Sequence, residues 1–179
     1  MRLIDDRELD LLDFYRASEL HGALLLAHLA RRTGDPALLC DLSRHAADEM
    51  RHAAIWAEVI VALGGSPQPR KDTYQSHYAA VLGRPGNLLE TLALTQVFER
   101  RVQIVYQRHL RAPGTHALVK QTLQALLEDE KRHLVWVKRW LDQQPGDVRG
   151  ALRRYQEADR AIAARLSEEL LGERQDRAA

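Results

Sequence analysis

Apolar residues recur at every third or fourth position through five long segments of the chain, with polar residues between them. This spacing is that of an amphipathic α-helix, and the strict alternation of a half-buried strand is missing almost everywhere. Glycine and proline gather in a few short stretches that separate the segments. The pattern predicts an all-α protein.

The segments predict five long helices and a short turn of helix, over 5–32, 37–63, 87–111, 116–142 and 148–172, with the short turn around 73–82. The first two helices and the next two are joined by short connections, which makes each pair antiparallel, whereas the connection between the pairs is long enough to run along a bundle. We therefore expect an antiparallel four-helix bundle over 1–145 with one long crossover. The fifth helix, within 146–179, belongs to the same domain and packs on the bundle or on a second subunit.

Bulk composition bounds the protein class. A chain of 179 residues with 45% hydrophobic and 28% charged residues is typical of one globular domain that folds without disulfides. The first twelve residues are acidic where a signal peptide would be basic and then apolar, and Cys40 has no second cysteine to pair with. We expect a cytoplasmic protein without a membrane span. The net charge of +1 gives no reason to expect a nucleic-acid partner.

One short motif occurs twice. The pentapeptide Asp-Glu-Met-Arg-His at 48–52 returns as Asp-Glu-Lys-Arg-His at 129–133. Each copy is preceded by a glutamate on the previous helix, 30 residues upstream in the first case and 31 in the second. Each helical pair thus offers one Glu and one Glu-x-x-His, and the six candidate ligands are Glu19, Glu49, His52, Glu99, Glu130 and His133.

All four glutamates fall on the apolar stripes of their helices, so they should point into the core. Glu19, for example, shares its stripe with Leu12 and Leu26, and Glu130 shares its stripe with Leu123 and Val137. Burial of one unpaired carboxylate costs several kcal/mol, and four close together also repel one another. No Lys or Arg lies on these stripes. Two divalent cations would balance the four charges, with the histidines as neutral ligands.

The ligand types limit the metal. Carboxylates and imidazoles without thiolate suit iron or manganese, and zinc would bind as well. The same set, one Glu from each of two helices and one Glu-x-x-His from each of the other two, is described for di-iron and di-manganese bundles. We expect two iron ions, with a manganese–iron pair as an alternative.

In this order of ligands over residues 5–142, the sequence resembles the ferritin-like superfamily of non-haem di-iron carboxylate proteins, in the neighbourhood of rubrerythrin, bacterioferritin and a di-iron tRNA hydroxylase. The resemblance implies a reaction with dioxygen or peroxide, an electron donor and a substrate still to be identified, and assembly into a homo-oligomer such as a dimer. It also implies that the glutamates act as carboxylate ligands, some of them bridging, and that His52 and His133 are terminal ligands.

The branch of the superfamily is less defined. Rubrerythrins usually carry a further cysteine site and a further carboxylate where Val102 stands here, while bacterioferritins share the second Glu-x-x-His, and Met50 matches their haem-binding Met. We favour an oxidase or oxygenase with an organic substrate, which the small residues Gly22 and Ala23 beside Glu19 could accommodate. The alternatives are a ferroxidase, iron-storage or peroxide-scavenging protein, and a bundle in which the metals are purely structural.

Several polar residues near the ligands receive other assignments. Asp48 and Asp129 could accept a hydrogen bond from the outer nitrogen of the opposite ligand histidine, or form surface ion pairs with the neighbouring arginines. Five more residues lie one or two turns from a ligand and are assigned to packing: Tyr15, His45, Thr95, Gln103 and Tyr106. The tryptophans are assigned to the core.

Overall fold

The computed structural model describes residues 3–171, with side chains described to residue 166, and within that range every regular element is a helix. The six helices are α1 (Asp6–Ala30), α2 (Pro36–Ala62), α3 (Tyr74–Leu82), α4 (Leu88–Arg111), α5 (Ala117–Asp142) and α6 (Val148–Leu171). The all-α prediction is confirmed, and the short turn expected around 73–82 is α3. The helix end predicted at 172 lies outside the described residues.

The helix ends follow local chemistry. The side chain of Asp5 accepts a hydrogen bond from the Glu8 amide at the start of α1, and Asp35 does the same for two amides at the start of α2, where Pro36 fits the first turn. Thr73 and Ser76 form a reciprocal capping box at the start of α3. Short polar side chains therefore fix where the helices begin.

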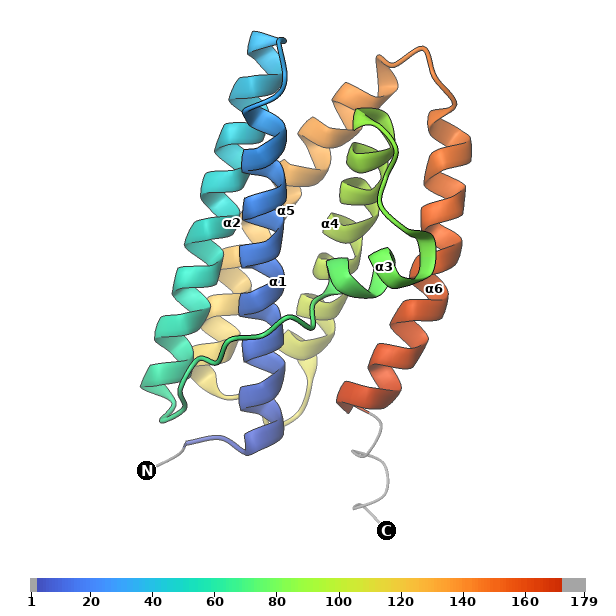
Figure 1. Ribbon diagram of the computed structural model, residues 1–179. Helices are drawn as coiled ribbons and strands as arrows, with labels where there is room; N and C mark the ends of the chain where they lie inside the picture. The colour runs from blue at the N-terminus through green and yellow to red at the C-terminus, as the bar shows by residue number, and fades with distance from the viewer. Residues whose placement is uncertain (1–2, 172–179) are drawn as a thin grey trace.

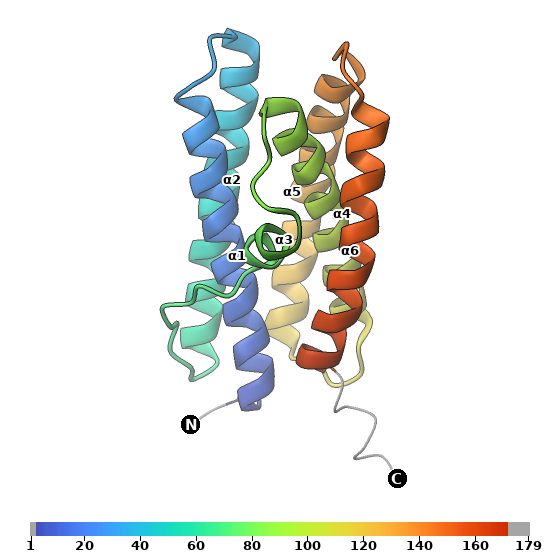
Figure 2. The same cartoon turned by 45° about the vertical axis from the view of Figure 1, so that its right-hand side comes forward.

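The long helices α1, α2, α4 and α5 lie roughly along one direction (Figure 1). Helix α1 packs against α2 and α4 against α5, each pair antiparallel, and α2 also contacts α5. The connection from α2 to α4 runs from one end of the molecule to the other and carries α3 midway, as expected of a long crossover. Turning the molecule shows α3 lying between α1 and α6 (Figure 2).

Helix α6 packs within the same chain, against α4 and α3. Its apolar face, which includes the buried Tyr155, Ile162 and Leu166, joins the main core. Arg101 of α4 forms a two-pronged ion pair with Asp159 of α6, and Tyr78 of α3 donates a hydrogen bond to the same carboxylate. One carboxylate thus ties α3, α4 and α6 together.

We expect Arg101→Met to lower the free energy of unfolding by about 3 kcal/mol. The substitution leaves the Asp159 carboxylate, whose side chain is only 13% exposed, without its cation. Arg154→Met is the matched control: Arg154 also pairs across α4 and α6, with Glu90, but its side chain is 50% exposed, against 13% for Arg101. Its loss should cost no more than about 1 kcal/mol. Urea denaturation of both variants measures these losses. Equal losses of unfolding free energy in the two variants would contradict a stabilising role for the Arg101–Asp159 ion pair.

Candidate metal centre

The six residues that the motif identifies meet in the middle of the molecule. Helices α1, α2, α4 and α5 each contribute at least one of them, and all six are buried, with 0 to 6% of each residue exposed. Their side-chain atoms form two groups that could each hold a metal ion, and Glu49 belongs to both. One group is Glu19, Glu49, His52 and Glu130; the other is Glu49, Glu99 and His133 together with His45.

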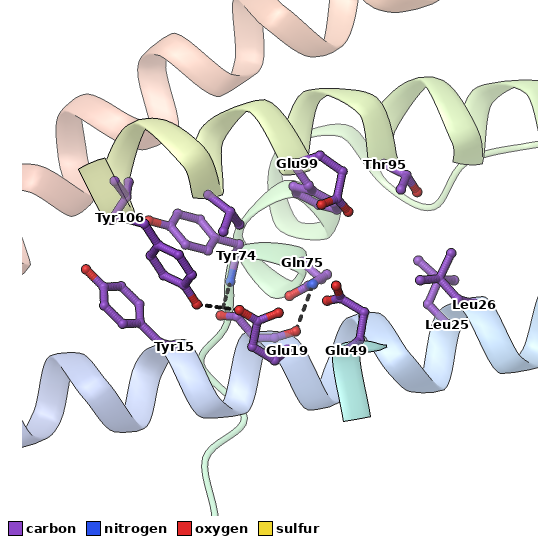
Figure 3. A pocket seen from close by; sticks show the side chains of 15 residues that line it. Tyr15, Glu19, Leu25, Leu26, Glu49, Tyr74, Gln75, Thr95, Glu99 and Tyr106 are labelled. Carbon is purple, nitrogen blue, oxygen red and sulfur yellow. Dashed lines mark hydrogen bonds between the residues drawn. The ribbon is translucent and has the colours of Figure 1, made fainter. Parts of the chain in front are cut away.

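Helical geometry explains the convergence. Residues three apart lie side by side on a helix, so Glu49 and His52 of α2 face inward together, as do Glu130 and His133 of α5. Figure 3 shows Glu19 on α1 and Glu99 on α4 pointing toward each other across the space between these helices. The apolar stripes assigned from the sequence are the buried faces, and Leu12, Leu92, Leu123 and Val137 are fully enclosed beside the site.

Several buried polar atoms in this cluster have no hydrogen-bond partner. Nδ1 of His52 lies 3.2 Å from Glu130 Oε1, and Nδ1 of His133 lies 3.3 Å from Glu49 Oε1, but neither contact has hydrogen-bond geometry. A buried polar atom left without a partner costs about 1–3 kcal/mol. The atoms concerned are His45 Nε2, Glu49 Oε1, His52 Nδ1, Glu130 Oε1 and His133 Nδ1. The carboxylate oxygens and the two Nδ1 atoms of this set, closely spaced and facing one interior, fit metal ions.

The outer nitrogens of the two motif histidines are braced across the helix pair. His52 of α2 places Nε2 3.2 Å from Asp129 of α5, and His133 of α5 places Nε2 3.3 Å from Asp48 of α2. A carboxylate at this position keeps the proton on Nε2 and leaves the lone pair of Nδ1 free for a metal. The hydrogen-bonding role expected for Asp48 and Asp129 is confirmed.

The expected ion pairs form as well. Arg51 donates to both Asp48 and Asp129, at 2.8 and 2.7 Å, and Arg132 also contacts both. Burial would raise the pKa of Asp129, but Arg51, His52 and Arg132 outweigh it and lower the pKa to about 2. Both aspartates therefore stay charged and keep their histidines oriented.

Close packing of the carboxylates splits their proton affinities. Burial and the charges of Glu19 and Glu99 raise the pKa of Glu49 well above its usual value. Burial opposes ionisation of Glu99, but His45 and His133 hold its pKa well below the usual value. Burial would also lower the pKa values of His52 and His133, yet the adjacent carboxylates raise them, to about 10 and about 11. Protons thus supply the positive charge when no metal does.

Two residues assigned to packing from the sequence contact the cluster, so that assignment is wrong for them. Tyr106 donates a hydrogen bond to Glu19 and accepts one from Trp56. His45, only 1% exposed, lies within 3.3 Å of both Glu49 and Glu99. The signal for His45 was its position one turn before Glu49, on the same buried face.

A cavity adjoins the cluster between α1 and α4, and α3 covers it (Figure 3). Its volume is about 30 Å³, room for about two water molecules. Gly22 lines it, as expected, whereas Ala23 does not. A Cβ at position 22 would lie only 2.9 Å from Glu49 Oε2, so the missing side chain leaves space for this carboxylate. Gln75 of α3 also lines the cavity and donates a hydrogen bond to the Ser18 carbonyl.

Comparisons of the chain with models of protein families, with curated proteins and with solved structures give no match. Within the described residues, no helix is both long enough and apolar enough to cross a membrane.

We expect the metal-free protein to lose stability between pH 7 and 9.5. An unfolded histidine has a pKa near 6.5, while folded His52 and His133 keep their protons to about 10 and about 11. Their stabilisation is full below pH 6.5 and is lost as the pH rises toward those values. The free energy of unfolding should fall by at most about 1.4 kcal/mol per histidine per pH unit.

Urea denaturation of chelator-treated protein measures this slope. His52→Gln removes one of the two groups and should make the slope shallower. A flat profile from pH 7 to 9.5 would contradict the proton-filled site.

Proposed function

We propose that this protein is a di-iron oxidoreductase of the ferritin-like type, in which an antiparallel four-helix bundle holds the metals. The observation that carries the proposal is the buried set of four carboxylates and two histidines. Several of their polar atoms have no hydrogen-bond partner and face one interior. Two divalent cations balance four carboxylates. No thiolate takes part, which favours iron or manganese over metals that prefer sulfur.

The two groups of side chains suggest which residues would hold each metal ion. One metal would be held by Glu19, Glu49, His52 and Glu130, and the other by Glu49, Glu99 and His133, with Glu130 also within reach because its Oε2 lies 3.4 Å from His133 Nδ1. Bound iron would supply electron transfer to dioxygen or peroxide. Tyr106 orients Glu19 through its hydrogen bond, and the apolar wall of the cavity limits the access of water.

The volume of the cavity limits the size of the substrate. Dioxygen and peroxide are small enough for a space of about 30 Å³, and an organic substrate is not, unless Gln75 and the rest of α3 move aside. The oxidase or oxygenase that we favour therefore requires α3 to open. The small cavity supports ferroxidase or peroxide-scavenging activity as the second candidate, since neither needs a larger space.

Anaerobic loading with ferrous iron tests the proposal. We expect about two irons per chain by elemental analysis and new near-ultraviolet absorbance of ferric iron when oxygen is admitted. Glu49→Ala and Glu130→Ala should each lower the iron content, whereas Glu128→Ala, two residues before Glu130 with a side chain 68% exposed, should not. Iron that binds but stays ferrous in air would make the metals structural, and iron content equal in all variants would refute the site.

Gly22→Ala tests the space that the missing side chain leaves beside Glu49. The new methyl group must displace the Glu49 carboxylate, so we expect ferrous binding to weaken about tenfold, as when a group that orients a ligand is lost. Gly34→Ala is the control because a Cβ there meets nothing within 4 Å. Titration with ferrous iron under anaerobic conditions compares them. Unchanged affinity in Gly22→Ala would show that Glu49 binds from another position.

A further inference from the structure

His45 is the third histidine of the cluster, and its contact with Trp136 fixes which of its nitrogens carries the proton. The indole Nε1 of Trp136 donates to His45 Nδ1 at 3.2 Å. An indole N–H can only donate, so Nδ1 must offer a lone pair. Both side chains are buried, with His45 1% and Trp136 8% exposed.

The opposite nitrogen of the ring faces the carboxylates. A neutral imidazole carries one N–H, so with Nδ1 accepting, the proton belongs to Nε2. His45 Nε2 lies 3.2 Å from Glu99 Oε1 and 3.3 Å from Glu49 Oε1, which is within hydrogen-bond distance, although neither contact has hydrogen-bond geometry in this structure. In this tautomer Nε2 has a proton to donate and no lone pair with which to bind a metal.

His52 and His133 have the reverse arrangement. Their outer Nε2 atoms face aspartates, which accept a hydrogen bond from N–H, and their inner Nδ1 atoms have no hydrogen-bond partner. His45 instead has a donor on its outer side, so its inner nitrogen is the protonated one. Three histidines thus face one interior, but the groups behind them assign two to binding a metal and one to donating a hydrogen bond.

Packing holds the His45 ring in this orientation. It stacks on His133 with 3.7 Å between ring centroids and an angle of 28° between the planes. Trp136 meets it edge-on, at 5.6 Å and 84°. A rotation that exchanged the two nitrogens would break the indole hydrogen bond in a buried place.

We propose that Trp136 holds His45 as an Nε2–H donor to Glu99 and Glu49, so that His45 positions these two ligands and does not bind the metal itself. The inference rests on the proposed metal centre. It leaves that centre with two histidine ligands, although three imidazoles line it.

Nuclear magnetic resonance of protein labelled with ¹⁵N-histidine tests the tautomer, first after chelator treatment and then with two equivalents of zinc, a diamagnetic probe. We expect His45 to remain protonated at Nε2 in both samples, while Nδ1 of His52 and of His133 shifts on zinc binding. A metal-bound Nε2 on His45 would overturn the inference and leave the metal centre intact. If zinc changes none of the three rings, the metal centre and the inference both fail.

Variants separate positioning from ligation. His45→Ala should weaken zinc binding about tenfold, and His45→Gln, which keeps an N–H near the position of Nε2, should restore it to within about threefold of the parent. Failure of the glutamine to rescue would contradict a donor role.

Trp136→Phe should release His45 Nδ1 and shift the ¹⁵N signals of His45 toward a mixture of tautomers. Trp140→Phe, one turn further along α5, should leave those signals unchanged. Signals of His45 that stay the same in Trp136→Phe would show that the indole does not fix the tautomer.

Discussion

The burial of four carboxylates in one interior is the constraint on which the rest of the structure depends. Glu19, Glu49, Glu99 and Glu130 are each at most 6% exposed, and no lysine or arginine reaches them among the described residues. In water-poor surroundings such a cluster is stable only with positive charge inside. Protons on His52 and His133 meet part of this need, and two metal ions would meet all of it.

The surrounding residues orient the side chains of the candidate ligands. Asp48 and Asp129 cross from one helix to the other to hold the motif histidines, and the arginines that contact the aspartates lie at the surface, outside the cluster. Tyr106 holds Glu19, and the absence of a side chain at Gly22 admits Glu49. The cavity is lined by residues of α1, α3 and α4 and by Glu49 of α2, and α3 is the one short helix among the described residues and lies in the crossover.

Much of this arrangement could be predicted from the sequence, because residues three or four positions apart lie on the same face of a helix. The spacing of apolar residues located the five long helices, and the apolar stripes placed six candidate ligands in one interior without any knowledge of the fold. His45 and Tyr106 were assigned to packing because periodicity places a residue on a buried face but does not say what it meets there. Their partners, Trp136 and Glu19, lie 91 and 87 positions away in the chain. The volume of the cavity and the place of Gln75 in its lining depend on how α3 packs, which no repeat in the sequence specifies.

We propose that two metal ions share this interior. Diffraction from crystals grown with ferrous iron, with data collected on both sides of the iron absorption edge, tests it most directly. We expect two anomalous peaks per chain, one among Glu19, Glu49, His52 and Glu130 and one beside Glu99 and His133. The absence of peaks in this interior, with iron bound only at surface carboxylates, would contradict it.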